Sequence, residues 1–486
     1  MNDVSLVLPE AVVVALATLV VVIDAIMGPR TRRDVLALVV VAGLIVALAA
    51  GPLVTEPRLG FSGLVLVDTF TTFFRVLFIV LAGLTVLISP AYLARHAVPA
   101  GEFYATVLFA TVGGMTIALA NDLVTLFVGL ELMSIPIYVL AGMQRRDRAS
   151  NEAALKYFLL GAFSSALLVY GFAWLYGVTG TTELGPIAAA LGRSGLTDGP
   201  TIVALSLITV GLGFKAAAVP FHQWTPDAYD GAPTPATAFM SVAPKAAAFA
   251  AILRIMVGGL SPLGGDWTAA FAILALVTMT LGNVVALAQT NVKRMLAYSS
   301  IAHTGYILAG LAAFTSGDPA NADAANASVI FYAFAYGVMN LGAFAALLYL
   351  ATEGTRGATL DELNGFAKRN ALGALTFAVF LISLTGIPPT VGFWAKVFVI
   401  QPVLDADLTW LAVAIALNAV VAAFYYLRVV VHMYMYDADA KAPALVSPRL
   451  LDVSLGISAA AVVVLGILPD ALYRWALDAA APLVVR

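Results

Sequence analysis

The feature that most constrains this chain is a succession of apolar runs, each about 20 residues long, that continues from one end of the sequence to the other. A helix of that length crosses the hydrocarbon core of a bilayer. With 62% hydrophobic and 11% charged residues, the chain also has more apolar surface than a soluble core can bury. We predict an all-α polytopic membrane protein with about 14 transmembrane helices. Their approximate ranges are 9–28, 35–52, 67–92, 103–120, 122–143, 153–178, 201–222, 236–258, 268–289, 295–315, 328–352, 372–401, 408–435 and 452–482.

The basic residues of the loops indicate how the chain is oriented. Most of them fall in alternate loops, namely Arg30, Arg32, Arg33, Arg95, Arg145, Arg146, Arg148, Lys293, Arg294, Arg356, Lys368, Arg369, Lys441 and Arg449. The opposite loops contain little beyond Arg58 and Arg193. Because loops rich in lysine and arginine stay in the cytoplasm, this pattern predicts an even number of spans with both termini outside. No loop is long enough for a separate soluble domain, so residues 1–486 are predicted to form a single integral membrane domain.

Several classes of site are absent from the sequence. The chain has no cysteine, which excludes disulfides, thiolate zinc sites and thiolate-held iron–sulfur clusters. It has no basic tract typical of a nucleic-acid site, no phosphate-binding loop and no cluster of histidines and carboxylates at metal spacing. We therefore predict neither a cofactor nor a metal ion in this chain.

Four ionisable residues lie inside the predicted spans. Glu131 is in the fifth span, and Lys215, Lys245 and Lys396 are in the seventh, eighth and twelfth. A charge at the bilayer centre costs roughly 3 kcal/mol, so these side chains must face the interior of the bundle, water or one another. Burial favours the neutral form of both residue types, so each can change its protonation in response to a nearby charge. We predict that the four form a proton relay; structural ion pairing or snorkelling is the alternative.

Two of these spans contain helix breakers. Pro220 follows Lys215 by five residues, and Gly386, Pro388 and Pro389 precede Lys396. Proline removes a backbone donor, and in a membrane such breaks persist only where protein or a polar cavity satisfies the freed carbonyls. Broken helices beside charged residues are a feature of transporter sites, and their occurrence in two distant segments suggests an internal repeat. Kinks used only for packing are the alternative.

Two histidines are further candidates for the relay. His303, in the tenth span, has Tyr298, Ser299 and Thr304 as nearby polar residues, although a packing role is equally consistent with its position. His222 lies in the bend after the seventh span, where it either lines a cytoplasmic entrance or caps a helix.

Other intramembrane cations are predicted to have structural roles. Arg75, Arg254 and Arg428 are expected to pair with acceptors, because a guanidinium stays charged and is a poor proton carrier. Lys156 is close enough to the cytoplasmic face to snorkel.

Long stretches of the sequence resemble the antiporter-like membrane subunits of respiratory complex I, the bacterial NADH:quinone oxidoreductase. They are GLELMSIPIYVLAG with Glu131, SNEAALKYFLLGAFSSALLVYG, GFKAAAVPFHQWTPDAYDGAPTPATAFMSVAPKAA with Lys215 and Lys245, LAYSSIAHTGY, and GIPPTVGFWAK ending in Lys396. The resemblance implies a fourteen-helix fold with two inverted five-helix repeats, at about 103–258 and 268–436, in which helices 7 and 12 are broken. It also implies proton translocation driven by NADH-to-quinone electron transfer in other subunits.

The resemblance assigns a role to each of the four residues. It implies that Glu131 is the switching carboxylate, Lys215 its partner, Lys245 the central relay and Lys396 the lysine on the exit side. Within the family, the APTPATAF segment and Lys396 argue against the M branch, in which a glutamate is expected at that position. The L branch is disfavoured because this sequence shows no long C-terminal extension.

Partners and location also follow from the resemblance. The expected partners are the lipid bilayer and the other membrane subunits of the complex, including the antiporter-like subunit M and a small K-type subunit, and no nucleic acid. NADH, FMN, iron–sulfur clusters and quinone would belong to the complex as a whole. The expected location is the bacterial inner membrane, with periplasmic termini. The alternative is a subunit of a multisubunit cation/proton antiporter, because the same fold serves in both.

Overall fold

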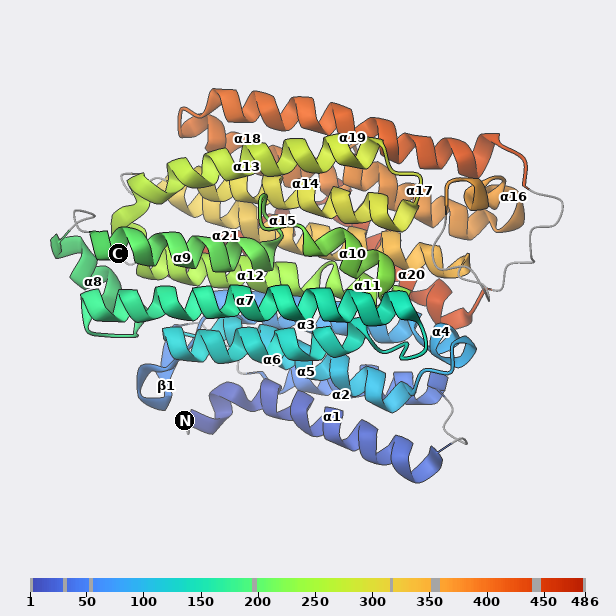
Figure 1. The fold of residues 1–486 in the computed structure, drawn as a ribbon, viewed down its shortest axis with the longest axis horizontal. Helices are drawn as coiled ribbons and strands as arrows, with labels where there is room; N and C mark the ends of the chain where they lie inside the picture. Colours follow the sequence, from blue (N-terminus) through green and yellow to red (C-terminus); the bar gives the residue numbers. More distant parts are fainter. Residues whose placement is uncertain are drawn as a thin grey trace.

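The computed structural model describes residues 3–28, 33–51, 56–194, 199–314, 318–350, 359–438 and 447–483. Figure 1 shows a bundle of helices that run side by side along one direction, with both chain ends at the same end of the bundle. In this part of the chain, 11 helices are long and apolar enough to cross a membrane. The protein is therefore a multi-pass membrane protein, and the position of the two termini agrees with an even number of crossings.

The helices of the first half of the chain follow one another with short connections. They are α1 (Leu8–Met27), α2 (Arg33–Ala49), α3 (Thr69–Ile88), α4 (Pro90–Arg95), α5 (Ala100–Leu119), α6 (Leu123–Ala141), α7 (Arg148–Thr179), α8 (Leu184–Ser194), α9 (Gly199–Ala216), α10 (Trp224–Gly231), α11 (Thr234–Met240) and α12 (Ala243–Ile252), which continues into a π-helical turn at Leu253–Gly259.

The helices of the second half are similarly arranged. They are α13 (Gly264–Leu287), α14 (Val292–Ala312), α15 (Pro319–Ala346), α16 (Phe366–Arg369), α17 (Ala371–Thr385), α18 (Val391–Asp405), α19 (Thr409–Met435), α20 (Arg449–Ile467) and α21 (Asp470–Ala480). Short 3-10 turns lie at Asp3–Val7, Phe61–Gly63, Ser261–Leu263, Leu347–Tyr349, Asp361–Leu363 and Ala481–Leu483.

The predicted number of fourteen spans is not confirmed by the eleven long apolar helices. Outside these eleven, α2 has 17 residues, α17 and α18 have 15 each, and α14 has 21 but a more polar sequence. Two of the predicted spans also differ in form from the structure. The range 452–482 is divided into α20 and α21, which meet at Pro469, and the helical part of 67–92 is divided into α3 and α4, after a first residue, Val67, that ends a strand.

The one departure from an all-helical fold among the described residues is a small antiparallel hairpin. Its strands are β1 (Arg58–Gly60) and β2 (Val65–Val67). Gly63 in the turn between them has a φ of +92°, a conformation that glycine adopts without steric cost. The hairpin lies at the end of the bundle where the termini lie (Figure 1).

The predicted breaks in helices 7 and 12 are confirmed. The first separates α9 from α10, and the second separates α17 from α18. A third break, between α11 and α12 in the predicted eighth span, was not predicted. Each break interrupts the ladder of backbone hydrogen bonds inside the protein and leaves carbonyl groups that accept hydrogen bonds from side chains, as Ala216 accepts from Thr304, Met240 from Tyr229 and Leu384 from Lys396.

The centre of the bundle is formed by α11, α12 and α15. Every residue in the apolar window of Thr234–Gly259 is buried, as are 94% of those in Ala320–Tyr349, compared with 33% for Arg449–Ile467 on the outside. Polar side chains on the central helices are thus removed from lipid, and Asn340 of α15 donates a 2.9 Å hydrogen bond to Ser241 Oγ, next to α11.

Helices α13 and α14 approach closely through glycine. A Cβ atom at Gly305 would lie 2.4 Å from the backbone nitrogen of Met279, and one at Gly282 would lie 2.5 Å from that of Ala302. Small residues at such contacts let membrane helices pack backbone to backbone.

We expect Gly305→Ala to destabilise the protein by about 1–3 kcal/mol, because the added methyl group has to push two backbones apart. Gly177→Ala is the matched control, since a Cβ at Gly177 in α7 meets no atom within 4 Å. Thermal unfolding of the solubilised protein measures both variants. Equal melting temperatures for Gly305→Ala and the unsubstituted protein would contradict this packing.

Candidate functional site

The structure brings Glu131 of α6 and Lys215 of α9 together. Lys215 Nζ lies 3.5 Å from Glu131 Oε1 and donates a 2.7 Å hydrogen bond to Ser134 Oγ, while Ser165 Oγ donates a 2.6 Å bond to Glu131 Oε1. Lys215 is buried at the end of α9, immediately before the break, and 26% of the Glu131 side chain is exposed. The sequence did not show this proximity, because the two residues are on different helices.

Lys245, in the first turn of α12, has a different environment. Its side chain is buried and donates hydrogen bonds to the backbone oxygen of Ser300 and, at 2.7 Å, to Ser300 Oγ. Tyr336 of α15 donates to the same Ser300 Oγ at 2.8 Å, and the ammonium lies 5.1 Å from the centre of the Tyr336 ring. No carboxylate among the described residues forms an ion pair with Lys245, so its charge is balanced only by dipoles and the ring.

His303 of α14 lies next to this group and is almost completely buried. Its Nδ1 is 2.8 Å from Tyr332 Oη and its Nε2 is 3.3 Å from Tyr426 Oη. The rings of His303 and Tyr336 are 5.1 Å apart. The sequence had suggested Tyr298, Ser299 and Thr304 as polar neighbours. The direct hydrogen bonds of the ring are instead to tyrosines of α15 and α19, and Ser299 is connected to His303 through the hydroxyl of Tyr426. A relay through these residues stays a prediction.

Lys396, in the second turn of α18, points back into the break that precedes its helix. Its Nζ donates a 2.9 Å hydrogen bond to the carbonyl of Leu384 near the end of α17, and it lies 5.3 Å from the centre of the Tyr306 ring. The freed carbonyl at the break therefore stabilises the buried ammonium. Tyr306 is also a ring neighbour of His303, at 5.6 Å, so α14 lies between Lys245 and Lys396.

A single side chain links the break in helix 7 to the site of Lys245. Thr304 Oγ1 donates a 2.7 Å hydrogen bond to the carbonyl of Ala216, the residue after Lys215, and lies 3.3 Å from the backbone oxygen of Ser300. Since Ser300 also accepts from Lys245, hydrogen bonds connect the end of α9 to the site of Lys245. We call Glu131, the three lysines and the polar groups that contact them the polar layer; Lys396 joins it through Tyr306, the ring neighbour of His303.

The predicted site residue His222 is not part of this layer. It is half-buried in the turn between α9 and α10, and no hydrogen bond or ion pair joins it to Glu131 or the three lysines in the described part of the chain. A role for His222 stays a prediction.

An ionic network holds α10 after the break. Asp227 accepts a 2.8 Å hydrogen bond from Lys156 of α7 and a 2.9 Å bond from Arg294 of α14. Burial raises the pKa of the Asp227 carboxyl, but the hydrogen bonds from these two cations lower it more, so the pKa lies below its ordinary value. Lys293, predicted from the sequence as a loop residue, is buried and donates to the carbonyls of Asp230 and Ala232 at the end of α10. Lys156, which was predicted to reach towards solvent, therefore also forms an ion pair with Asp227.

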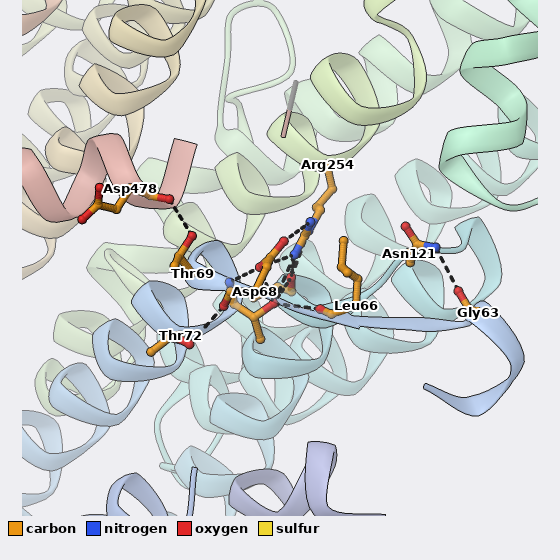
Figure 2. Close-up of polar contacts among 10 residues, drawn as sticks. Gly63, Leu66, Asp68, Thr69, Thr72, Asn121, Arg254 and Asp478 are labelled. Atoms are coloured by element: carbon orange, nitrogen blue, oxygen red, sulfur yellow. Dashed lines mark hydrogen bonds and ion pairs between the residues drawn. The ribbon is translucent and has the colours of Figure 1, made fainter. Parts of the chain in front are cut away.

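The intramembrane arginines have structural partners, as predicted. Figure 2 shows the guanidinium of Arg254 directed at the carboxylate of Asp68, which comes just before α3. Two hydrogen bonds of 2.9 and 3.0 Å join the pair, and Arg254 also donates to the carbonyl of Ala118. Arg75 makes a similar pair with Glu10, at 2.7 and 2.9 Å.

Arg428 is different, because it donates to the backbone oxygens of Leu287 and Gln289. No carboxylate partner for Arg428 is present in the described ranges.

Sequence reasoning missed the neutral partners of the relay residues. They meet the charged and imidazole side chains either through a hydroxyl group, as do Ser134, Ser165, Ser300, Tyr332 and Tyr426, or through an aromatic ring, as do Tyr306 and Tyr336. Serine and tyrosine are common in membrane helices, so only their position beside a charge distinguishes them. In the described part of the chain, no group of three histidine, aspartate or glutamate residues is arranged to hold a metal ion.

Comparisons with known proteins agree on the family. Residues 120–424 match the model of the family described as NADH:quinone oxidoreductase/Mrp antiporter, transmembrane. The chain is 44% identical to NADH-quinone oxidoreductase subunit N 1 of Sorangium cellulosum, over 89% of this chain and 87% of that protein. It is 42% identical to subunit N 2 of Symbiobacterium thermophilum, over 98% and 96% of the two chains.

Solved structures show the same fold. A chain of respiratory complex I from Thermus thermophilus with bound aureothin superposes with a TM-score of 0.77 at 32% identity, covering 95% of this chain and 98% of that one. A chain of the Mrp complex from Dietzia sp. gives a TM-score of 0.81 at 23% identity, covering 98% and 97%, which shows the shared fold alone. The chain belongs to the antiporter-like membrane protein family of NADH:quinone oxidoreductases and Mrp antiporters, within its NADH-quinone oxidoreductase subunit N group.

Proposed function

We propose that this protein is the proton-translocating membrane subunit N of a bacterial NADH:quinone oxidoreductase. The observation that carries the proposal is the layer of three buried lysines, which begins at the Glu131–Lys215 pair and continues through Lys245 to Lys396. Intramembrane charges are expensive and mark ion and proton pathways. Redox chemistry belongs to other subunits of the complex, where NADH is oxidised and quinone reduced.

The relay follows from the contacts of each ammonium. While Glu131 is ionised beside Lys215, its charge favours the protonated lysine; loss or withdrawal of that charge lets the proton leave. The hydroxyl and imidazole groups of Ser300, Tyr336 and His303 lie between Lys245 and Lys396 and provide donor and acceptor sites along the way. Lys396, beside the break between α17 and α18, is the last cation of the layer.

We infer two inverted repeats, at about 103–258 and 268–436, because each contains a helix that is broken beside a buried lysine. Lys215 precedes the break between α9 and α10, and Lys396 follows the break between α17 and α18. In an inverted repeat, equivalent breaks meet the middle of the membrane from opposite directions.

The Glu131 side chain indicates where a neighbouring membrane subunit binds. It lines an outward-facing groove of about 500 Å³ between α6 and α7, whose other lining residues include Phe127, Ala166 and Tyr170. A partly exposed carboxylate at this depth is costly in contact with lipid. We infer that a membrane subunit of the complex, of the M or K type, covers this face. Helices α4 and α16, which end in Arg95 and in Lys368 and Arg369, lie at the end of the bundle opposite the termini (Figure 1), and this supports a periplasmic location for both chain ends in the inner membrane.

The test is to tag the chain, solubilise the native membrane gently and assay the purified assembly. We expect flavin and iron–sulfur proteins to copurify, with NADH-driven quinone reduction and proton uptake into vesicles after reconstitution. Recovery with small membrane proteins only, without redox activity, would contradict this function.

The second candidate function is that of a subunit in a cation/proton antiporter, which the shared fold with the Mrp chain supports. Sodium- or potassium-dependent proton flux in reconstituted vesicles, without NADH, would favour it.

A further inference from the structure

We propose that a groove at the basic end of the bundle binds one anionic phospholipid. The groove has a volume of about 420 Å³ and lies where the start of α2, the end of α3, α4 and the start of α20 meet. Arg33 and Arg449 line it together with apolar side chains that include Leu87, Ile88, Leu450 and Leu451. This combination fits a phosphate head group with acyl chains attached.

The charges of the groove favour an anion. Neither Arg33 nor Arg449 forms an ion pair with a described residue, in contrast to the buried Arg75 and Arg254. Arg33 Nε is buried and donates to no acceptor in the described part of the chain. A buried donor without a partner is unfavourable, and a phosphate oxygen would satisfy it. Asp34 also lines the groove, so its lining contains two guanidinium groups and one carboxylate, which leaves a net positive charge.

The position of the groove selects a lipid over a soluble phosphate. It lies at the bundle end that carries the basic loops, opposite the termini, where α4 is seen in Figure 1. Its walls continue into exposed apolar side chains on the outer faces of α2 and α20, among them Leu38 (52% exposed) and Val453 (50% exposed). Acyl chains are thus able to run along these two helices while the head group stays between the arginines. Basic pockets between membrane helices on the cytoplasmic side are typical sites for anionic head groups.

The experiment uses the intact purified complex and a photoactivatable phosphatidylglycerol, with the labelled peptides identified by mass spectrometry. We expect labelling of peptides from α4 and α20. Unlabelled phosphatidylglycerol should compete, whereas phosphatidylcholine and inorganic phosphate should not.

Substitutions test the two arginines directly. Arg33→Gln and Arg449→Gln should each lower labelling about fivefold, since one basic residue near an anionic head group contributes about that much to binding. Arg33→Lys keeps the charge and should retain most of the labelling, which separates loss of charge from misfolding. Arg193→Gln, at an exposed site on α8, is the matched control and should leave labelling unchanged.

Each other outcome overturns the proposal. Competition by inorganic phosphate would make the groove a site for a free anion. Absence of labelling in the intact complex would mean that a protein subunit covers the groove. Equal labelling in the arginine variants and the control would mean that the lipid contact is not specific.

Discussion

Lys215→Met and Glu131→Gln are each expected to lower NADH-driven proton translocation and the coupled quinone reduction by roughly an order of magnitude while the complex still assembles. Both substitutions nearly preserve side-chain volume, and glutamine keeps an oxygen that accepts from Ser165. They remove the only carboxylate–ammonium pair in the polar layer of the described residues. Without the pair, the proton affinity of Lys215 no longer responds to its neighbour, so the first step of the relay is lost.

Proton uptake into vesicles and quinone reduction should be measured on the same preparations. Lys368→Met is the matched control, because Lys368 is exposed on α16 and, among the described residues, forms an ion pair only with the exposed Asp437. Proton pumping at full rate in both the Lys215→Met and Glu131→Gln variants would disprove the assigned roles. A normal ratio of protons to electrons at the reduced turnover is the expected result, because coupled quinone reduction slows together with the blocked relay. Quinone reduction at full rate with fewer protons translocated would show that the pair does not control turnover.

Asp68→Ala is expected to destabilise the protein by about 3–5 kcal/mol, because it leaves the buried guanidinium of Arg254 without its counter-charge. The exposed fractions of the two side chains are 4% for Arg254 and 0% for Asp68. Asp68 also caps α3, since its Oδ1 accepts a 2.8 Å hydrogen bond from the backbone nitrogen of Thr71. The pair joins the π-helical turn after α12 to the start of α3 (Figure 2), so its loss should loosen the end of the bundle where the termini lie.

Thermal unfolding in detergent and the yield of assembled complex report this loss. Asp68→Asn retains the cap but not the charge, and separates the two contributions. The double variant Asp68→Leu/Arg254→Met should recover much of the stability, because replacing both partners of a buried pair by apolar residues costs far less than removing one. Asp437→Ala breaks an exposed pair and should leave the melting temperature unchanged. A melting temperature of Asp68→Ala equal to that of Asp437→Ala would contradict this account.

The sequence predicted the fold best where the chemistry of a single residue decides the local backbone structure. The breaks next to Lys215 and Lys396 were correctly predicted from Pro220 and from Pro388–Pro389, because proline cannot donate the hydrogen bond that a helix requires. The break between α11 and α12 was missed, although Pro235 lies just before the predicted span 236–258 and Pro244 lies in it. In the structure, each proline lies in the first turn of a helix, where proline is well tolerated. The sequence alone did not show that two helices begin there.

For the site, the sequence identified the charged residues and the tertiary structure determined their partners. Glu131, Lys215, Lys245 and Lys396 stand out in a list of apolar spans because burying a charge is costly wherever it occurs. That cost does not depend on which helices are neighbours. The sequence alone therefore determined that this is a multi-pass membrane protein with buried ionisable groups and broken helices.

Only the tertiary structure decided that Glu131 faces Lys215, that Ser300 and Tyr336 hold Lys245, and that Lys396 bonds to the end of α17. The physical reason is that a hydrogen bond requires two atoms within about 3 Å in a suitable direction. That condition depends on the rotation and axial shift of each helix against the next, which are set by packing such as that at Gly305. Hydropathy and spacing along one chain contain no such information.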